Sequence, residues 1–357
     1  MAARFDTSPC PTPLWLSGGQ AQTLYAALFA QHHTVRFVRE RLDTADGDFL
    51  DLDWSGPGLH AEHPSGVHTI DLAHTAARRW INPGDWARLP VDGDALILFH
   101  GLEGSSLSHY SQSIAHYFRA RGWTVVVANF RGCSGFPNRM ARAYYSGDTL
   151  EIETLLQHVR RRLPQARWHA VGVSLGGNAL LKYLGEAGAG SVPLEACAAV
   201  SVPMDLPPCG RRLSDTFWGR QLYSRYFLRT IRRKIMNKAA VFPGSIDVMR
   251  TQHLRTLQEL DDLYTAPMHG YRNALDYWTR ASSLPVLPGI RVPTLILNAR
   301  NDPFVPQASL PGTRQASDQV LLHQPAQGGH CSFVTGQFPG HLHWLPMRLA
   351  AFFDTRT

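Results

Sequence analysis

Apolar runs alternate with amphipathic segments through the middle of the chain. The runs at residues 95–100, 123–130 and 194–202 are nearly continuous, without the apolar–polar alternation of a half-exposed strand. Residues 108–122 and 146–163 carry apolar side chains at helical spacing instead. Buried strands separated by helices predict a mostly parallel sheet that is covered by helices on both faces.

The N-terminal quarter follows this pattern less clearly. We expect residues 1–33 to form an irregular arm with a short helix near QTLYAALFA, and two strands at VRFVRERL and FLDLDW. The dipeptide Asp46-Gly47 between these two segments is a typical hairpin turn. Residues 56–93 are rich in Gly, Pro and His and predict an irregular connection.

The alternation stops after residue 202 and resumes near residue 292. Residues 203–287 lack strand-like runs and are expected to be helical, whereas VPTLILNA and DQVLLHQ again indicate strands. We therefore predict one α/β core made by residues 1–202 and 288–357. A helical cap, residues 203–287, would be inserted over the sheet edge that carries the functional loops.

One serine lies at the end of a predicted strand. Ser174 stands between Gly172 and Gly176 in the order G-x-S-x-G, with RWHAVGV before it and NALLKYL, a predicted helix, after it. A sharp strand-to-helix turn holds such a serine in a strained conformation and exposes its hydroxyl over the sheet. Ser174 is therefore the candidate nucleophile.

A serine hydroxyl needs a base, and the base needs an orienting acid. Asp302 follows the strand in NARNDPF, and His330 follows the next strand in the glycine-rich GGHCSF. Both loops open at the edge that carries Ser174, so we predict a Ser174–His330–Asp302 triad. Asp205, after the strand that follows the serine, is the alternative acid.

The strand at residues 95–100 leads into HGLEGSS, where an oxyanion-stabilising loop is expected. We predict that the backbone N–H groups of Leu102 and Leu175 bind the developing oxyanion. His100 and His109 are interpreted as hydrogen-bonding residues around this loop. His341 and His343 lack further ligands at zinc-like spacing, so no metal or other cofactor is expected.

Composition narrows the class of protein further. The 357 residues contain 44% hydrophobic and 18% charged residues, and no uninterrupted apolar stretch is long enough for a membrane-spanning helix. Five scattered cysteines and an N-terminus without a signal-like apolar region indicate reduced thiols and a cytoplasmic location.

The net charge of +7 is concentrated in residues 211–234, which carry eight Arg or Lys and one acid, Asp215. This segment has two interpretations: a solvated helix face, or a surface that contacts anionic membranes. No nucleic-acid-binding signature accompanies the charge.

Several strings resemble one family. HGLEGSS, NFRGCSGFPNR, YYSGDT, GVSLGGN, ELDDLYTAPMHGY, DYW and NARNDPF are similar to those of the YheT-type α/β-hydrolases, the AB hydrolase 4 group of carboxylesterase-like proteins. The resemblance runs from WLSGGQAQTL to GGHCSF. Two positions depart from it: Asn301, where the group commonly has an acid, and Gln20, where it often has His.

The resemblance implies an α/β-hydrolase fold and a serine hydrolase of carboxylic esters that uses Ser174, Asp302 and His330. We expect short- or medium-chain acyl esters, with lipid-like esters included because of the basic, aromatic cap. Acyl transfer or thioester hydrolysis by the same triad is the alternative within enzymes. A module with a vestigial triad that binds membranes or proteins is the alternative outside them.

Overall fold

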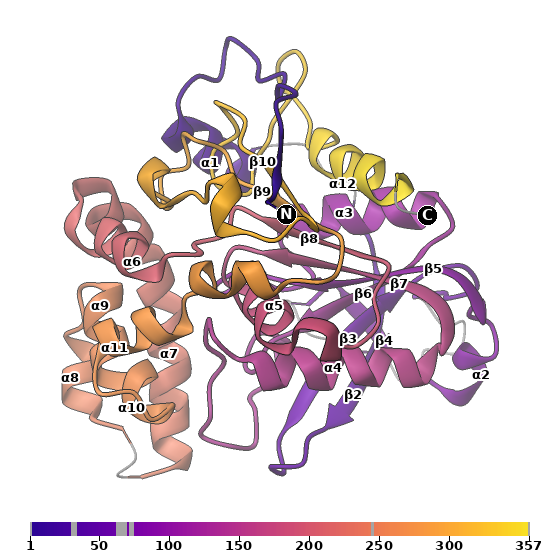
Figure 1. Cartoon of the computed structure of the whole chain (residues 1–357). Coiled ribbons are helices and arrows are strands. Elements are labelled where there is room, and N and C mark those ends of the chain that lie inside the picture. The colour runs from indigo at the N-terminus through magenta and orange to yellow at the C-terminus, as the bar shows by residue number, and fades with distance from the viewer. Residues whose placement is uncertain (1, 30–33, 62–69, 71–74, 244–245, 356–357) are drawn as a thin grey trace.

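The computed structural model describes residues 2–29, 34–61, 70, 75–243 and 246–355 (Figure 1). Its centre is a ten-stranded sheet in the order β1-β10-β9-β8-β7-β5-β6-β3-β2-β4. The strands are β1 (Arg4–Asp6), β2 (Phe37–Asp43), β3 (Phe49–Ser55), β4 (Ala77–Trp80), β5 (Asp92–Phe99), β6 (Thr124–Asn129), β7 (Gln165–Val173), β8 (Ala196–Val200), β9 (Thr294–Leu297) and β10 (Val320–His323). Only β3 runs antiparallel to its neighbours, β2 and β6, so the predicted mostly parallel sheet is confirmed.

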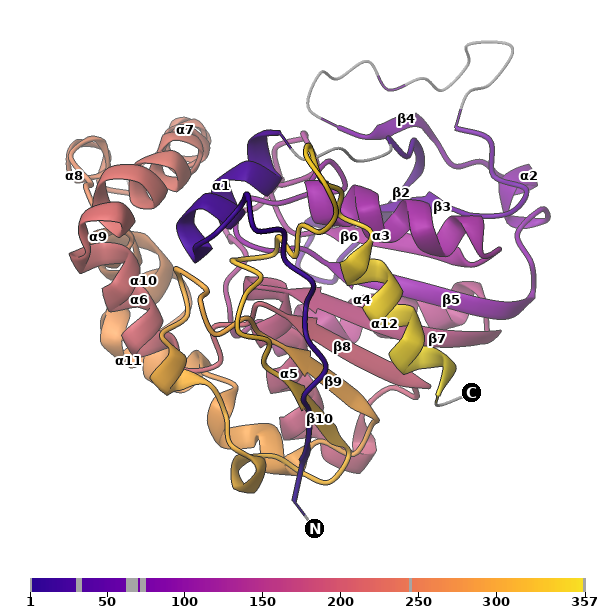
Figure 2. The same cartoon turned by 90° about the horizontal axis from the view of Figure 1, so that it is seen from above.

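Helices cover the sheet on both faces. On one face, α4 (Thr149–Arg162) and α5 (Leu175–Ala187) pack on a core that includes Ala95, Ile97 and Phe99 of β5. On the other, α3 (His109–Ala120) and α12 (Trp344–Asp354) pack on Leu96 and Leu98 of the same strand. Figure 2 shows α3 and α12 together on their side of the sheet. A continuous apolar strand fits here because both of its faces are buried.

The N-terminal arm is more regular than the sequence predicts. Besides α1 (Gly19–Leu28), it contains β1, which extends the sheet by pairing parallel with β10. Arg348 of α12 donates to the Asp6 carboxylate at 2.5 Å and so ties the arm to the last helix. The expectation of an irregular arm was therefore wrong at β1, whose three residues are too few to give a periodic signal.

The expected irregular connection at residues 56–93 was also wrong where the structure describes it; residues 62–69 and 71–74 lie outside the described part. The connection contains β4, parallel to β2, and the short helix α2 (Pro83–Trp86). Arg79 of β4 is buried and donates to both carboxylate oxygens of Asp85, which closes a capping box with Asn82. Because a buried side chain of β4 is an ion-paired arginine, the sequence of this strand lacks the apolar pattern by which a strand is predicted.

The chain between β8 and β9 is helical, as expected. It contains α6 (Leu206–Asp215), α7 (Arg225–Val241), α8 (Val248–Gln252), α9 (Leu257–Leu260), α10 (Ala266–Met268) and α11 (Ala274–Ala281), with two π-helical turns between them. These helices form a group beside the sheet (Figures 1 and 2) with an apolar cluster of their own, which includes Leu228, Ile231 and Leu260. Leu102 and Ala143, from loops of the sheet region, pack against that cluster.

Candidate active site

Ser174 occupies a strained turn between β7 and α5. Its backbone has φ 52° and ψ −117°, in the left-handed region that non-glycine residues rarely adopt. The Ser174 N–H donates to the Val200 carbonyl at 2.8 Å, and its own carbonyl accepts from the Asn178 N–H at 3.0 Å. Neighbouring strand and helix thus hold the turn in place.

The glycines around Ser174 are required by packing. A Cβ on Gly172 would lie 2.6 Å from the Gly177 Cα, and one on Gly176 would lie 2.5 Å from the carbonyl oxygens of Phe99 and His100. The G-x-S-x-G spacing therefore lets α5 start directly against the ends of β5 and β7.

The structure brings the three predicted residues together at the carboxyl ends of β7, β9 and β10. His330 Nε2 lies 3.0 Å from Ser174 Oγ, and His330 Nδ1 lies 2.8 Å from Asp302 Oδ2. An ionised carboxylate can only accept, so Nδ1 carries the proton and donates to Asp302. Nε2 is then left to accept from the Ser174 hydroxyl, which is the geometry a general base needs.

The backbone of its own loop orients the Asp302 carboxylate. Its side chain is fully buried, and Oδ1 accepts from the N–H groups of Phe304 at 2.7 Å and Val305 at 3.2 Å. The other oxygen is therefore held toward His330. Asp205, the alternative acid, precedes α6, and no hydrogen bond between it and His330 occurs among the described residues.

The pKa of His330 is shifted by two opposing effects. Burial disfavours the charged imidazolium and is the largest single effect, but the Asp302 carboxylate and Cys331, through charge and hydrogen bonds, together favour it by more. The pKa of His330 therefore lies above its ordinary value of 6.5. The Phe304 ring, 4.1 Å away between centroids, covers the imidazole on one side.

The two predicted oxyanion donors belong to chain segments that meet at Ser174. Gly101, just before Leu102, lies so close that an added Cβ would be 3.1 Å from Ser174 Cβ. Leu175 is the first residue of α5, where helical N–H groups have no partner within the helix. Within the described residues, no hydrogen bond to another protein group uses either amide.

His100 holds the loop that carries Leu102. Its Nδ1–H donates to the Gly101 carbonyl at 2.7 Å, and its Nε2 accepts from the Phe130 N–H at 3.1 Å. Complete burial lowers the pKa of His100 to about 4, so the ring is neutral and this tautomer is fixed. His109 bonds the Cys331 carbonyl at 3.0 Å. His100 thus bonds within the loop where the sequence interpretation placed both histidines, whereas this bond of His109 goes to the loop that carries His330.

The sequence did not reveal the residues that shape the loop at residues 328–330, called the histidine loop because it carries His330. Thr23 of α1 accepts the His330 N–H at 2.9 Å, and Gln22 accepts the Gly328 N–H at 3.0 Å. Asn301 donates to Gln22 at 3.0 Å and accepts from the Gly329 N–H at 3.0 Å. The only sequence signal was the resemblance of WLSGGQAQTL, because contacts between residues about 300 positions apart leave no local pattern.

The two positions that depart from the family pattern both have polar partners. Asn301 bridges α1 and the histidine loop, as described above. Gln20 accepts a hydrogen bond from the Tyr223 hydroxyl at 2.5 Å and so joins the arm to the helical segment between β8 and β9.

His341 and His343 stack on each other with ring centroids 4.5 Å apart. No group of three or more His, Cys, Asp or Glu in the described part of the chain is arranged to hold a metal ion. All five cysteines are buried and free.

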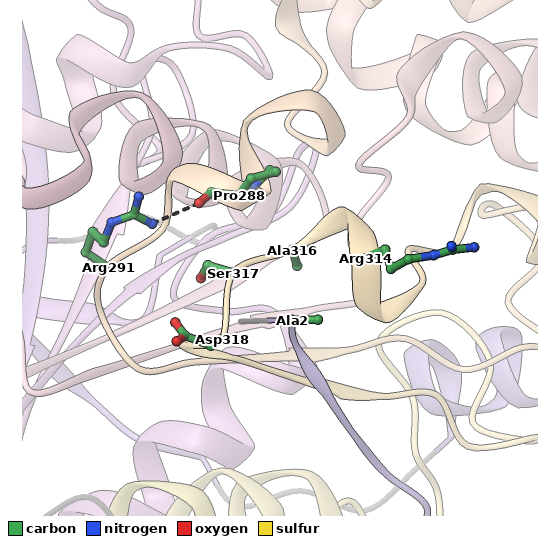
Figure 3. A pocket seen from close by; sticks show the side chains of 7 residues that line it. All are labelled: Ala2, Pro288, Arg291, Arg314, Ala316, Ser317 and Asp318. Carbon is green, nitrogen blue, oxygen red and sulfur yellow. Dashed lines mark hydrogen bonds between the residues drawn. The ribbon is translucent and has the colours of Figure 1, made fainter.

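A cavity of about 420 Å³ lies away from the triad (Figure 3). Its lining comes from the segments that precede β9 and β10 and from the arm: Ala2, Pro288, Arg291, Arg314, Ala316, Ser317 and Asp318. These segments lie at the amino ends of the strands, whereas Asp302 and His330 follow the carboxyl ends. The cavity is therefore separate from the candidate active site.

The sequence profile described as alpha/beta hydrolase fold matches residues 94–337, about two thirds of the chain. The chain belongs to the α/β-hydrolase fold family. This α/β-hydrolase is 34% identical to the Escherichia coli (strain K12) protein named "Putative esterase YheT", over 94% of this chain and 89% of that protein. It is 30% identical to the human protein named Phospholipase ABHD3, over 94% of this chain and 78% of that protein.

A third relative is the protein named Medium-chain fatty acid ethyl ester synthase/esterase 2 of Saccharomyces cerevisiae. It is 28% identical over 98% of this chain and 85% of that protein. Among solved structures, the proline iminopeptidase of Mycobacterium smegmatis matches with a TM-score of 0.51 and 16% identity, over 89% of this chain and 98% of that one. This structural likeness supports the fold alone.

Proposed function

We propose that this α/β-hydrolase is a serine hydrolase that cleaves carboxylic esters through an acyl-enzyme. The observation that carries the proposal is the hydrogen-bonded line from Ser174 Oγ through His330 to the buried Asp302 carboxylate. The names of the relatives, which include esterase and phospholipase, favour an ester as the substrate.

In this mechanism Ser174 Oγ attacks the ester carbonyl while His330 Nε2 takes the hydroxyl proton. The N–H groups of Leu102 and Leu175 stabilise the oxyanion, and Asp302 stabilises the imidazolium. His330 then protonates the leaving alcohol, and the acyl group stays on Ser174. Water, deprotonated by His330, attacks the acyl-enzyme, and His330 returns that proton to Ser174 Oγ as the carboxylic acid leaves. No step requires a metal or another cofactor.

We propose short- or medium-chain acyl esters, including lipid-like ones, as substrates. Aromatic side chains surround the histidine side of the triad: Tyr223 packs on Phe304 at 4.5 Å between ring centroids, and Phe227 packs on it at 6.3 Å. Tyr223 and Phe227 belong to residues 203–287, which we propose act as a cap over the site. Apolar rings beside a nucleophile suit an acyl chain better than a charged substrate.

The direct test is hydrolysis of p-nitrophenyl esters of increasing acyl length by the purified enzyme and by Ser174→Ala. We expect turnover by the wild-type enzyme and a loss of about 10⁴-fold or more in the variant. Faster turnover of acyl thioesters, or acyl transfer to an added alcohol in preference to water, would favour the alternative reactions. A folded wild-type protein that is inactive on every ester would contradict the proposal.

We propose further that the cap contacts anionic membrane surfaces. Phe217, Trp218 and Tyr226 are 70%, 51% and 69% exposed, and they alternate with exposed arginines, among them Arg220 and Arg225. Neither arginine has an ion-pair partner among the described residues. Exposed aromatic and basic side chains together are typical of interfacial binding.

Co-sedimentation with vesicles tests this contact. We expect the protein to bind phosphatidylserine-containing vesicles, and Trp218→Ser to weaken that binding. Equal binding to purely zwitterionic vesicles, or none to either kind, would contradict it. None of the helices in the described ranges combines the length and hydropathy needed to cross a membrane. The five buried free thiols support our proposal of a cytoplasmic location.

A further inference from the structure

The loop that carries the Leu102 amide is in contact with the cap through two consecutive residues. The Leu102 side chain packs against the cap cluster formed by residues such as Leu228 and Leu260. Glu103, the next residue, has φ 55°, in the left-handed region, and its side chain is only 7% exposed. A backbone this constrained keeps its conformation only while its surroundings hold it.

Glu103 is held by two partners. Its N–H donates to the Tyr144 hydroxyl at 2.8 Å, and that hydroxyl donates back to Glu103 Oε1 at 3.0 Å. Lys234 of α7 donates to the same oxygen at 2.8 Å. Tyr144 in turn stacks on Phe130, with ring centroids 5.6 Å apart and planes 5° apart. The core therefore holds Glu103 from one side and the cap from the other.

Lys234 is one of two lysines through which α7 reaches the core. Lys238, one helical turn later, donates to the carbonyls of Met140, Ala141 and Arg142 at 3.1, 2.9 and 2.6 Å. Residues four apart lie on one face of a helix, so this face of α7 is the docking face. Lys238 contacts a different core segment, and Lys234 contacts the oxyanion-stabilising loop itself.

We propose that Lys234 is a positioning residue: its ion pair with Glu103 couples the seating of the cap to the position of the Leu102 amide. The amide is in place when α7 is docked, and it is displaced when the cap moves away. The inference rests on the proposed function, because an oxyanion donor matters only if Ser174 forms a tetrahedral intermediate. A shift of about 1 Å in such a group can lower the rate up to about 100-fold without changing the bonds of the triad.

The test compares Lys234→Met with Lys234→Arg, which keeps the charge, and with Lys182→Met. Lys182 pairs with Glu186 on α5 at 2.7 Å, so its variant breaks an ion pair of similar length that does not involve the oxyanion-stabilising loop. For Lys234→Met we expect kcat to fall about 10-fold to 100-fold with KM within about twofold. Affinity for a trifluoromethyl ketone, which forms an oxyanion on Ser174, should fall by a similar factor.

Lys234→Arg and Lys182→Met should both keep kcat within about threefold of the wild-type value, and thermal unfolding identifies any variant that fails to fold. Should Lys234→Met fail to fold, Glu103→Gln replaces it, with the same loss of kcat and of ketone affinity expected. A folded Lys234→Met variant with unchanged kcat and ketone affinity would overturn the proposal, and so would a variant in which only KM rises. Neither result would contradict the proposed serine hydrolase activity. A wild-type enzyme without esterase activity would contradict the proposed function, and this inference with it.

Discussion

At the scale of single residues, hydrogen bonds to the backbone restrict the conformations of the side chains in the site. One carboxylate oxygen of Asp302 accepts hydrogen bonds from the backbone and the other accepts one from His330. The imidazole ring is therefore oriented before any substrate arrives. His330 is also held through its backbone by Thr23. Preorganised groups of this kind need no reorganisation during the reaction, which is the main source of catalytic power in such sites.

Asp302→Asn should separate the two candidate acids. An asparagine amide would donate to Nδ1 and favour the wrong tautomer of His330, so we expect kcat to fall about 10³- to 10⁴-fold. Asp205→Asn should stay within about threefold of wild type, because Asp205 does not bond to the imidazole. Steady-state kinetics on one p-nitrophenyl ester measures both variants. A larger loss for Asp205→Asn would reverse the assignment.

The pH dependence follows from the raised pKa of His330. Only the neutral imidazole can accept the Ser174 proton, so kcat/KM should rise with pH, with a midpoint above 6.5. In Asp302→Asn the largest effect that raises the pKa of His330 is absent while burial still lowers it, so the midpoint of the residual activity should move down. A pH–rate profile of each protein measures this. A wild-type midpoint at or below 6.5 would contradict the electrostatic account.

At the scale of elements, the turn at Ser174 works because α5 starts in contact with two strands. Gly176 faces the carbonyl oxygens of Phe99 and His100. Because these two residues lie at the end of β5, their carbonyl groups cannot move without disturbing that strand. The position of Ser174 and the packing of α5 are therefore one structural property.

Gly176→Ala should lower the free energy of unfolding by about 1–3 kcal/mol, because its methyl group would overpack against backbone atoms. Gly190→Ala is the matched control, since a Cβ there has no neighbour within 4 Å. We expect the control to change stability by less than about 0.5 kcal/mol. Urea unfolding measures both variants, and equal stabilities would show that the close approach is not rigid.

Elements with a strong local pattern could be predicted, and those that depend on distant partners could not. The apolar run of β5 and the amphipathic α3 indicated their own structure. β4 did not, because its buried Arg79 depends on Asp85. That Ser174, Asp302 and His330 lie together could be predicted from chain order and strand ends. The contact between Lys234 and Glu103 was not, because 131 residues separate its partners.

At the scale of the whole molecule, a buried ionic network connects the antiparallel end of the sheet to the active-site loops. Arg39 of β2 donates to both oxygens of Asp53 at 2.6 and 2.7 Å. Asp53 also accepts from Ser106, which lies in the loop that follows Leu102, and from Asn129. The network thus joins three strands to the loop that follows β5 and leads from Gly101 to Ser106.

Arg39→Met should destabilise the protein by about 3–5 kcal/mol, because it leaves the Asp53 charge buried without its cation. Arg121→Met is the control: its pair with Asp354 is 35% and 49% exposed, so we expect a change of at most about 1 kcal/mol. Calorimetry compares the two. Similar small effects would mean that the network does not support the fold.

The central claim is that Ser174 is an activated nucleophile, and reaction with a fluorophosphonate probe tests it most directly. We predict one adduct on the intact, folded wild-type protein, located on Ser174 by peptide mass spectrometry. Ser174→Ala should give no adduct, and Asp302→Asn should react far more slowly than wild type. A folded wild-type protein that stays unlabelled, or that is labelled at another residue, would contradict the account.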